Sequence, residues 1–329
     1  MKLPRASSTP PAFSVVIPTY NQADYLKGAI KSVREQTFQD FEIIIVNNHS
    51  TDHTMGVIGE VGDPRVRAID FQNHGVIGAS RNVGIRASEG PYVAFLDSDD
   101  TWYATKLERV AEAIEEDPQV GLICHDQDLV WDGHVAGRSR YGRAAGFRGS
   151  MYEQLLFEGN GPSTSATVVR RQHLDEVGYF SEDEAFAAAE DFDLWLRLSK
   201  VCGFQFLREV LGTHHFHGSN SSDNVEFQLR SILNVLDKHC GELRDSTPSY
   251  SKRAIRRRYA HAFFGAGRQH QRRGAFKQPL GYYTRTVLTY PFHLRAYAGL
   301  ALLFADRFLG QSRRRRITEA VLGTSWRWG

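Results

Sequence analysis

The stretch Tyr92-Val-Ala-Phe-Leu-Asp-Ser-Asp-Asp-Thr-Trp102 decides how the rest of the chain is interpreted. Its first five residues are apolar and favour a β-strand buried on both faces. Three carboxylates follow at once, and open α/β sheets bind ligands at the carboxyl ends of such strands. Asp97 and Asp99 point the same way on an extended chain and suit a shared divalent cation. The alternative is a polar loop in which Asp99 or Asp100 caps the next helix.

The composition excludes several classes of protein. The chain has 329 residues, 41% hydrophobic and 24% charged, which is an ordinary globular balance for one large or two smaller domains. A net charge of +2 gives no sign of a nucleic-acid partner, although basic residues gather late in the chain. Three cysteines without a CxxC pair argue against a zinc site and suit a reducing cytosol. No apolar run is long enough to span a bilayer, and residues 1–12 lack a signal-peptide core.

Strands and helices are predicted to alternate through the first half of the chain. Apolar runs predict strands at 13–20, 41–46, 66–71 and 92–96. Helical spacing predicts helices between them at 21–36, 54–59 and 75–87. This alternation indicates an open, mainly parallel α/β sheet flanked by helices, with the loops that follow its strands along one edge.

The second half is predicted to continue this sheet and then to become helical. Strands are predicted at 120–125, 164–170 and 204–211, and helices at 105–114, 151–157, 173–177 and 190–198. Residues 130–150 contain five glycines and are predicted to form a mobile, irregular segment. We therefore expect a flexible segment at 1–12, an α/β domain at 13–222 and a helical, basic region at 223–329.

Five fragments occur in an order that resembles the family-2 glycosyltransferases. They are Phe13–Asn21, Phe41–Thr54, Ala79–Gly84, Tyr92–Trp102 and Ala189–Leu198. The resemblance covers residues 13–222 and implies a GT-A fold and an inverting transfer from a nucleotide sugar. It further implies a UDP-sugar as the first choice of donor and a hydroxyl of a glycan or lipid-linked acceptor, in cell-envelope or surface polysaccharide synthesis.

The resemblance also implies which residues bind the nucleotide sugar. They are Pro18, Thr19, Tyr20, Asn21, Asn48, Arg81, Asn82, Asp97 and Ser98. Asn48 stands where many relatives carry an acid, and this departure leaves the base open because an amide can accept or donate a hydrogen bond. The alternatives are a strand-ending turn for the loop at 18–21, a surface position for Arg81, and a helix cap for Asp52 in the second loop.

A metal site and a catalytic pair follow from the same resemblance. Asp99 would coordinate Mn²⁺ or Mg²⁺ between the donor phosphates, with Asp97 nearer the ribose or in the second shell of the ion. His217 would add a ligand, and His214 and His215 compete for that role. Asp191 would act as the general base on the acceptor hydroxyl, oriented by Glu190. The alternative for this acidic pair is stabilisation by the helix N-terminus.

Other readings of the chain remain open at this stage. The segment 288–308 and the basic run at 313–316 suit an anionic membrane surface, and the alternative is a solvated helical appendage or an oligomer contact. A nucleotidyltransferase would need a glycine-rich basic loop after the first strand, which is absent. An oxidoreductase would need GxGxxG there. A binding module without activity is supported only by Asn47 and Asn48.

Overall fold

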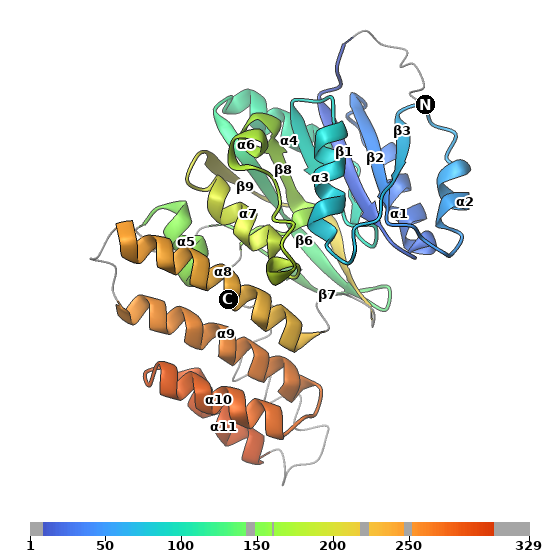
Figure 1. The fold of residues 1–329 in the computed structure, drawn as a ribbon. Coiled ribbons are helices and arrows are strands. Elements are labelled where there is room, and N and C mark those ends of the chain that lie inside the picture. Colours follow the sequence, from blue (N-terminus) through green and yellow to red (C-terminus); the bar gives the residue numbers. More distant parts are fainter. Residues whose placement is uncertain (1–8, 143–148, 160, 218–223, 247–251, 306–329) are drawn as a thin grey trace. The chain divides into compact units, whose positions relative to one another are not determined.

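The structure is a computed structural model that describes residues 9–142, 149–159, 161–217, 224–246 and 252–305 (Figure 1). The chain divides into two compact units, one of 1–143 with 161–220 and one of 144–160 with 221–329. The first unit contains the sheet. Helix α5 (Met151–Glu158) belongs to the second unit, although the sequence analysis placed it in the domain at 13–222.

Four parallel strands form the N-terminal half of the sheet. They are β1 (Phe13–Thr19), β2 (Phe41–Asn47), β3 (Val66–Asp70) and β4 (Tyr92–Phe95). Their order is β3-β2-β1-β4, and every residue of β1 and β2 is buried. The connecting helices are α1 (Ala23–Arg34), α2 (Thr54–Gly59) and α3 (Ile77–Ala87). The carboxyl ends of all four strands therefore meet at one edge, as the sequence predicts.

The other half of the sheet mixes parallel and antiparallel pairs. Its strands are β5 (Thr101–Trp102), β6 (Val120–Trp131), β8 (Thr167–Arg170) and β9 (Gly203–Phe216). Strand β8 lies antiparallel between β4 and β6, β9 runs parallel to β6, and β5 closes the order antiparallel to β9. The helices of this half are α4 (Lys106–Glu116), α6 (Arg171–Val177) and α7 (Glu190–Leu198). The predicted open α/β sheet is confirmed, with its parallel part concentrated in the first four strands.

Two layers of helices bury the two faces of the sheet. Helices α1 and α4 share one apolar core with the odd-numbered residues of β1, through Leu26, Val33 and Leu107. On the other face, Gly84 of α3 lies directly against Val16. Trp195 of α7 packs beside Phe95 with ring centroids 6.4 Å apart. Trp195 and Trp102 are both buried and form part of the core.

The glycine-rich segment after β6 is more ordered than the sequence analysis predicts. Strand β7 (His134–Ser139) folds back antiparallel on β6 through a hairpin turn at Asp132 and Gly133. Both turn residues have positive φ, 49° and 73°, which is the backbone that an Asp-Gly hairpin adopts. The expectation of an irregular segment is therefore wrong for 134–139, and residues 143–148 lie outside the described residues.

The second unit is helical. With α5 it contains α8 (Val225–Ser246), α9 (Lys252–Arg272), α10 (Lys277–Thr289) and α11 (Leu294–Ala305). The ring of Tyr283 lies between Gly267 of α9 and Gly299 of α11, and its hydroxyl donates to Gln271 Oε1 at 2.6 Å. The absence of side chains at both glycines is what lets three helices close around one ring. None of the helices in the described ranges has the length and apolar content needed to cross a bilayer.

Candidate active site

The carboxylates after β4 are fixed at the edge of the sheet by backbone hydrogen bonds. Leu96 N–H donates to the carbonyl of Val16 at 3.1 Å, which continues the sheet pattern to the last residue before the acids. Asp97 N–H donates to Ser165 Oγ at 3.1 Å, and Asp100 N–H donates to the carbonyl of Asp97 at 3.1 Å. The tight turn that results sends the three carboxylates toward different partners.

Arg81 joins the first of these carboxylates to the start of α7. Its side chain is 4% exposed, with Nη2 donating to Asp97 Oδ1 at 2.7 Å and Nη1 donating to Glu190 Oε1 at 2.6 Å. Burial opposes the charge of Arg81, but the Asp97 and Glu190 carboxylates outweigh it and raise the pKa above the usual arginine value. The alternative that Arg81 is a surface residue is thereby excluded. Its guanidinium connects the end of β4 with the segment expected on the acceptor side.

Glu190 and Asp191 differ sharply in their surroundings. Glu190 is 5% exposed and held by Arg81. Burial raises its pKa to about 7, the Arg81 charge opposes that rise, and the neighbouring Asp191 charge adds to it. Asp191 is half-buried, and its Oδ1 accepts from Phe192 N–H at 2.7 Å. Asp193 is buried and paired with Arg197 at 2.8 Å. Glu190 is thus fixed inside the protein, while Asp191 reaches solvent.

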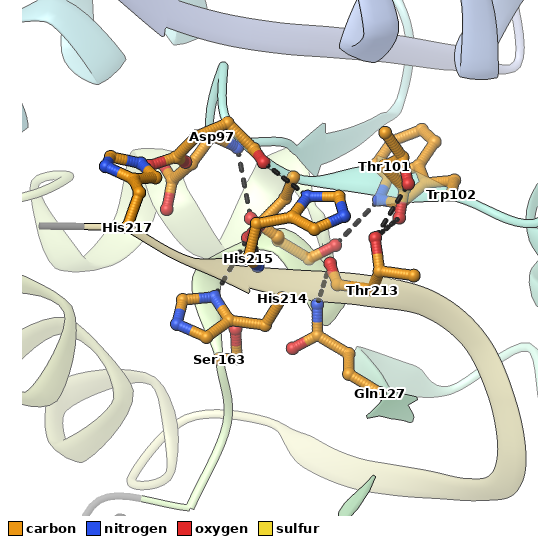
Figure 2. A network of polar contacts seen from close by, with 12 residues as sticks. Asp97, Thr101, Trp102, Gln127, Ser163, Thr213, His214, His215 and His217 are labelled. Carbon is orange, nitrogen blue, oxygen red and sulfur yellow. Dashed lines mark hydrogen bonds and ion pairs between the residues drawn. The ribbon is translucent and has the colours of Figure 1, made fainter. Parts of the chain in front are cut away.

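His214 and His215 lie near the end of β9, and His217 directly follows that strand (Figure 2). All three contact Asp99 or Asp100. His217 Nε2 lies 2.8 Å from Asp99 Oδ2, and the His217 ring stacks on Tyr25. His214 Nδ1 lies 3.2 Å from Asp100 Oδ2. His215 Nδ1 lies 2.6 Å from the backbone carbonyl oxygen of Asp99. The backbone N–H of His215 donates to Asp100 Oδ1. The His217 ring is thus directed to the Asp99 carboxylate.

These contacts shift the protonation of the two aspartates and of His214. Burial raises the pKa of Asp99 to about 6, with the Asp100 and Asp97 charges adding to the rise. Burial opposes charge on His214, but the Asp100 carboxylate beside it raises its pKa to about 9. The pKa of Asp100 is lowered against burial by His214. Asp100 therefore forms an ion pair with His214. It does not cap α4, whose N-cap residue is Thr105.

The described residues contain no group of three or more His, Cys, Asp or Glu side chains arranged to hold a metal ion. What they contain is one carboxylate and one imidazole, from Asp99 and His217, within hydrogen-bonding distance of each other. Asp97 is occupied by Arg81. Oxygen and imidazole ligands both suit Mn²⁺, and Mg²⁺ commonly binds through one or two carboxylates plus substrate phosphates. The donor set therefore fits an ion completed by a diphosphate.

The loops after β1, β2 and β3 are connected by side-chain amides. Asn21 Oδ1 accepts from Thr51 N–H at 2.7 Å, which joins the first loop to the second. Asn48 N–H donates to the carbonyl of Thr19 at 2.9 Å. Asn48 Oδ1 accepts from Asn73 N–H at 2.8 Å, which joins the second loop to the third. These loops form one connected rim, with one lone pair of the Asn48 amide oxygen already engaged.

Several predicted nucleotide-binding residues lie in or beside this rim. Tyr20 is 55% exposed, and Pro18 and Thr19 are buried at the end of β1. Thr19 Oγ1 has no hydrogen-bond partner in the part of the chain that the structure describes. Ser98 Oγ donates to Gln22 Oε1. These positions leave Tyr20 as the accessible ring of the first loop.

Asn82 and Asp52 serve local structure. Asn82 is buried, and its amide binds the backbone of Phe180 in both directions, at 2.9 Å each, and also donates to Glu182. The structure thus does not bring Asn82 to the carboxylates. Asp52 accepts from the N–H groups of Ala23 and Thr54, at the first turns of α1 and α2, which is the capping alternative.

Ser165 is a site residue that the sequence analysis missed. It is buried, accepts from Asp97 N–H and also hydrogen-bonds the Asp100 side chain. It lies in the short 3₁₀ turn Thr164–Ala166, which directly precedes β8. The run of small hydroxyl residues at 163–165 was the available signal. That these hydroxyl groups lie near Asp97 follows only from the pairing of β8 with β4, which the sequence does not show.

Comparison with known proteins places the chain in a family. The sequence model of the family described as "Glycosyl transferase family 2" matches residues 14–178. An uncharacterized glycosyltransferase of Nostoc sp. is 35% identical over 221 residues, which are 63% of this chain and 66% of that protein. A chondroitin synthase of Pasteurella multocida is 28% identical over 248 residues, which are 74% of this chain and 24% of that protein.

A solved structure gives the same fold. TarS residues 1–349 of S. aureus, in complex with UDP-GlcNAc, align with a TM-score of 0.63 and 19% identity, covering 94% of this chain and 90% of that one. At such low identity the likeness shows the fold alone, and the expected GT-A-type fold is confirmed. The family match covers half of the chain, and the protein belongs to glycosyltransferase family 2.

Proposed function

We propose that this glycosyltransferase moves a sugar from a UDP-sugar to a hydroxyl of a glycan or lipid-linked acceptor, with inversion at the sugar. The observation that carries the proposal is the buried Arg81 between Asp97 and Glu190. It holds a carboxylate of the donor side and a carboxylate of the acceptor side on one guanidinium. The UDP-GlcNAc complex of TarS and the relation to a chondroitin synthase support a UDP-sugar and a glycan.

The donor would bind at the rim formed by the first three loops. Tyr20 offers an exposed ring, and Thr19 Oγ1 is a buried hydroxyl without a partner among the described residues. Asn48 would contact the base. Its Oδ1 accepts from Asn73 N–H and has a second lone pair, and its Nδ2 is a donor. Asn48 can therefore both accept from the N–H and donate to a carbonyl oxygen of a uracil imide. Asp97, fixed by Arg81, would lie nearer the ribose.

Asp99 and His217 would hold a divalent ion, Mn²⁺ or Mg²⁺, together with the donor phosphates. When bound, such an ion stabilises the charge that grows on the departing nucleoside diphosphate. Because His217 and Asp99 lie 2.8 Å apart, the two ligands come from segments that are already adjacent. Asp100 and His214 would act as supporting groups that fix the end of β9 against the carboxylate loop.

Asp191 would take the proton of the acceptor hydroxyl as that hydroxyl attacks the sugar. It is half-buried at the start of α7 and reaches solvent, whereas Glu190 is held by Arg81. Glu190 and Arg81 are therefore positioning residues, and Asp191 is the catalytic residue.

We also propose a cytoplasmic location with peripheral membrane association through the helical region, in cell-envelope or surface polysaccharide synthesis. The three cysteines are all in described segments and form no disulfide, which suits a reducing compartment. A lipid-linked acceptor would itself be at a membrane surface.

Two measurements test the proposal. The first is calorimetric binding of UDP, dTDP, GDP and CDP, with Mn²⁺ and with EDTA, to the wild type and to Asp99→Ala. We expect binding of UDP that depends on the ion and is lost in Asp99→Ala. Preference for another nucleotide would overturn the UDP assignment, and no binding of any nucleotide would favour a binding module without activity.

The second measurement is transfer by Asp191→Asn. Removing a general base typically costs 10²- to 10⁴-fold in rate. We expect a loss of about that size with UDP affinity nearly unchanged, while Asp175→Asn, an exposed aspartate of α6, keeps wild-type transfer. Wild-type transfer by Asp191→Asn would show that the base is another group.

A further inference from the structure

Helix α11 turns an apolar stripe away from the protein. Leu294 is 78% exposed, Tyr297 45% and Phe304 50%, and Ala301 is exposed as well. Their spacing of three and four residues places them on one face of the helix. The opposite face, with Ala296, packs against Tyr283. These four residues therefore stay exposed on the side of α11 that faces away from Tyr283.

The end of α10 and the turn after it extend this apolar surface. Leu288 is 78% exposed at the last turn of α10, and Phe292 is 70% exposed in the turn before α11. Single exposed apolar side chains are ordinary, but a contiguous apolar surface marks an interaction site. We call this surface the α10–α11 face and define it by Leu288, Phe292, Leu294, Tyr297 and Phe304.

The segment that forms this face and its neighbouring helices has an excess of basic residues, of which Arg258 and Arg268 are buried and Arg257 is paired with Glu158. Residues 252–305 contain eleven lysines and arginines and no aspartate or glutamate. Arg253 lies over the Phe292 ring at 5.5 Å, and the exposed Arg295 follows Leu294 in the chain. At the other end, the Phe304 ring contacts Phe276, which precedes the exposed Lys277. Cations therefore border the apolar stripe at both ends.

From this combination we propose that the α10–α11 face docks on an anionic lipid bilayer. The apolar side chains would enter the interface, and the arginines and lysines would contact acidic headgroups. A second copy of the chain would set cations against cations. The segment 306–329 has six arginines and two acids, so its charge does not complement the face either. The proposal gives the membrane association a defined surface and stands whether or not the transfer reaction is as proposed.

The test is flotation of the full chain with vesicles of phosphatidylcholine alone or mixed with phosphatidylglycerol. We expect binding only to the mixed vesicles, weakened by high salt. Phe292→Ser with Leu294→Ser should lower partitioning about a hundredfold or more, because each buried side chain of this size contributes about 1.5–3 kcal/mol. Arg253→Gln with Arg295→Gln should lower it roughly thirtyfold, at about 1 kcal/mol for each basic residue.

Matched controls make the same changes in the first unit. Val135→Ser with Val201→Ser alters exposed apolar residues, and Lys31→Gln with Lys200→Gln removes two exposed charges. Both should partition as the wild type does. The proposal is overturned if the full chain ignores anionic vesicles or if the α10–α11 variants bind as the wild type does. It is also overturned if light scattering shows a dimer that those variants lose. UDP binding, measured on every variant in solution, reports separately on the proposed transferase.

Discussion

Arg81 shows how one residue type solves a problem of burial. Asp97 is partly buried and Glu190 is buried, and an unpaired carboxylate in such a position is costly. The planar guanidinium has separate N–H groups for each of them, with the Phe180 ring 5.3 Å from its centre. A lysine has one compact charge and cannot reach both carboxylates in the same fixed directions.

We therefore expect Arg81→Lys to lower both stability and transfer. Breaking a buried charge pair typically costs about 3–5 kcal/mol. Because the lysine can still pair with one of the two carboxylates, we expect the unfolding free energy to fall by about 3 kcal/mol or less. The control is Arg86→Lys on the same helix, whose pair with Glu182 is about half exposed on both sides and should cost about 0–1 kcal/mol. Urea unfolding measures the loss of stability in each of the two variants. Equal costs in the two variants would show that the Arg81 bridge contributes nothing.

The His214–Asp100 pair predicts a pH dependence of stability. The pKa of His214 is raised to about 9 in the folded protein, from 6.5 when unfolded. The folded state therefore holds the extra proton between these values, so the stabilisation is complete below about pH 6.5 and is lost as the pH rises through about 9. Thermal unfolding in EDTA should show this loss in the wild type. His214→Gln should show a flatter profile over the same range, and parallel profiles would contradict the assignment.

Among the elements, helix α3 shows the clearest dependence of packing on one residue. A Cβ on Gly84 would overlap the side chain of Val16 in β1, so the helix can approach the sheet only where this position is glycine. Gly56 of α2 has open space around its Cβ direction. The two positions have the same residue and both lie in helices, but they differ in what surrounds them.

Gly84→Ala and Gly56→Ala should consequently move stability in opposite directions. Overpacking of this kind costs about 1–3 kcal/mol, so Gly84→Ala should lower the midpoint of urea unfolding. Gly56→Ala should raise it, because alanine is favoured over glycine in a helix by about 1 kcal/mol. A neutral Gly84→Ala would mean that α3 shifts away from β1 at little cost.

The elements also show what a sequence can and cannot predict. Strands β1, β2 and β4 were predicted correctly because they are mostly apolar and β1 and β2 are buried on both faces. Strand β6 was predicted to end at His125 but continues to Trp131. Residues 126–128 of this strand are polar yet buried, and Asp126 and Asp128 accept hydrogen bonds from Tyr141 N–H and Arg138. These partners lie in and just after β7, so they depend on a hairpin that the sequence analysis did not predict.

Some residues of the candidate site could likewise be identified from sequence, and others could not. The acids at 97–100 and 190–191 could be identified from sequence, because each acidic run directly follows or begins a clear element. The role of Arg81 could not, because its two partners lie 16 and 109 residues away in the chain. Nor could the histidine that contacts the Asp99 carboxylate, because His217 follows the end of β9 and comes near the acids only once that strand has paired with β6.

At the scale of the whole molecule, every proposed donor, metal and base residue belongs to the first unit. The core of the second unit depends on Tyr283 between two glycines, and a Cβ on Gly299 would lie 2.8 Å from Tyr283 Cζ. Disturbing that core should leave the nucleotide site intact.

We therefore expect Gly299→Ala to lower the stability of the chain by about 1–3 kcal/mol while UDP affinity stays unchanged. Gly281→Ala, on an open position of α10, is the control and should keep or raise stability. Thermal unfolding and calorimetry with Mn²⁺ measure the two properties. Loss of UDP binding by folded Gly299→Ala protein would show that the nucleotide site needs the second unit.

The position of β9 has a consequence for the order of assembly during folding. This strand pairs in parallel with β6, more than 80 residues earlier in the chain, and contacts of such separation form slowly. Its last residues are the ones that carry His214 and His215 to the carboxylate loop. A folding intermediate in which β1 to β4 have paired but β9 has not would have the carboxylate loop in place without these histidines beside it. Recovery of metal-dependent nucleotide binding during refolding should therefore lag behind the recovery of secondary structure.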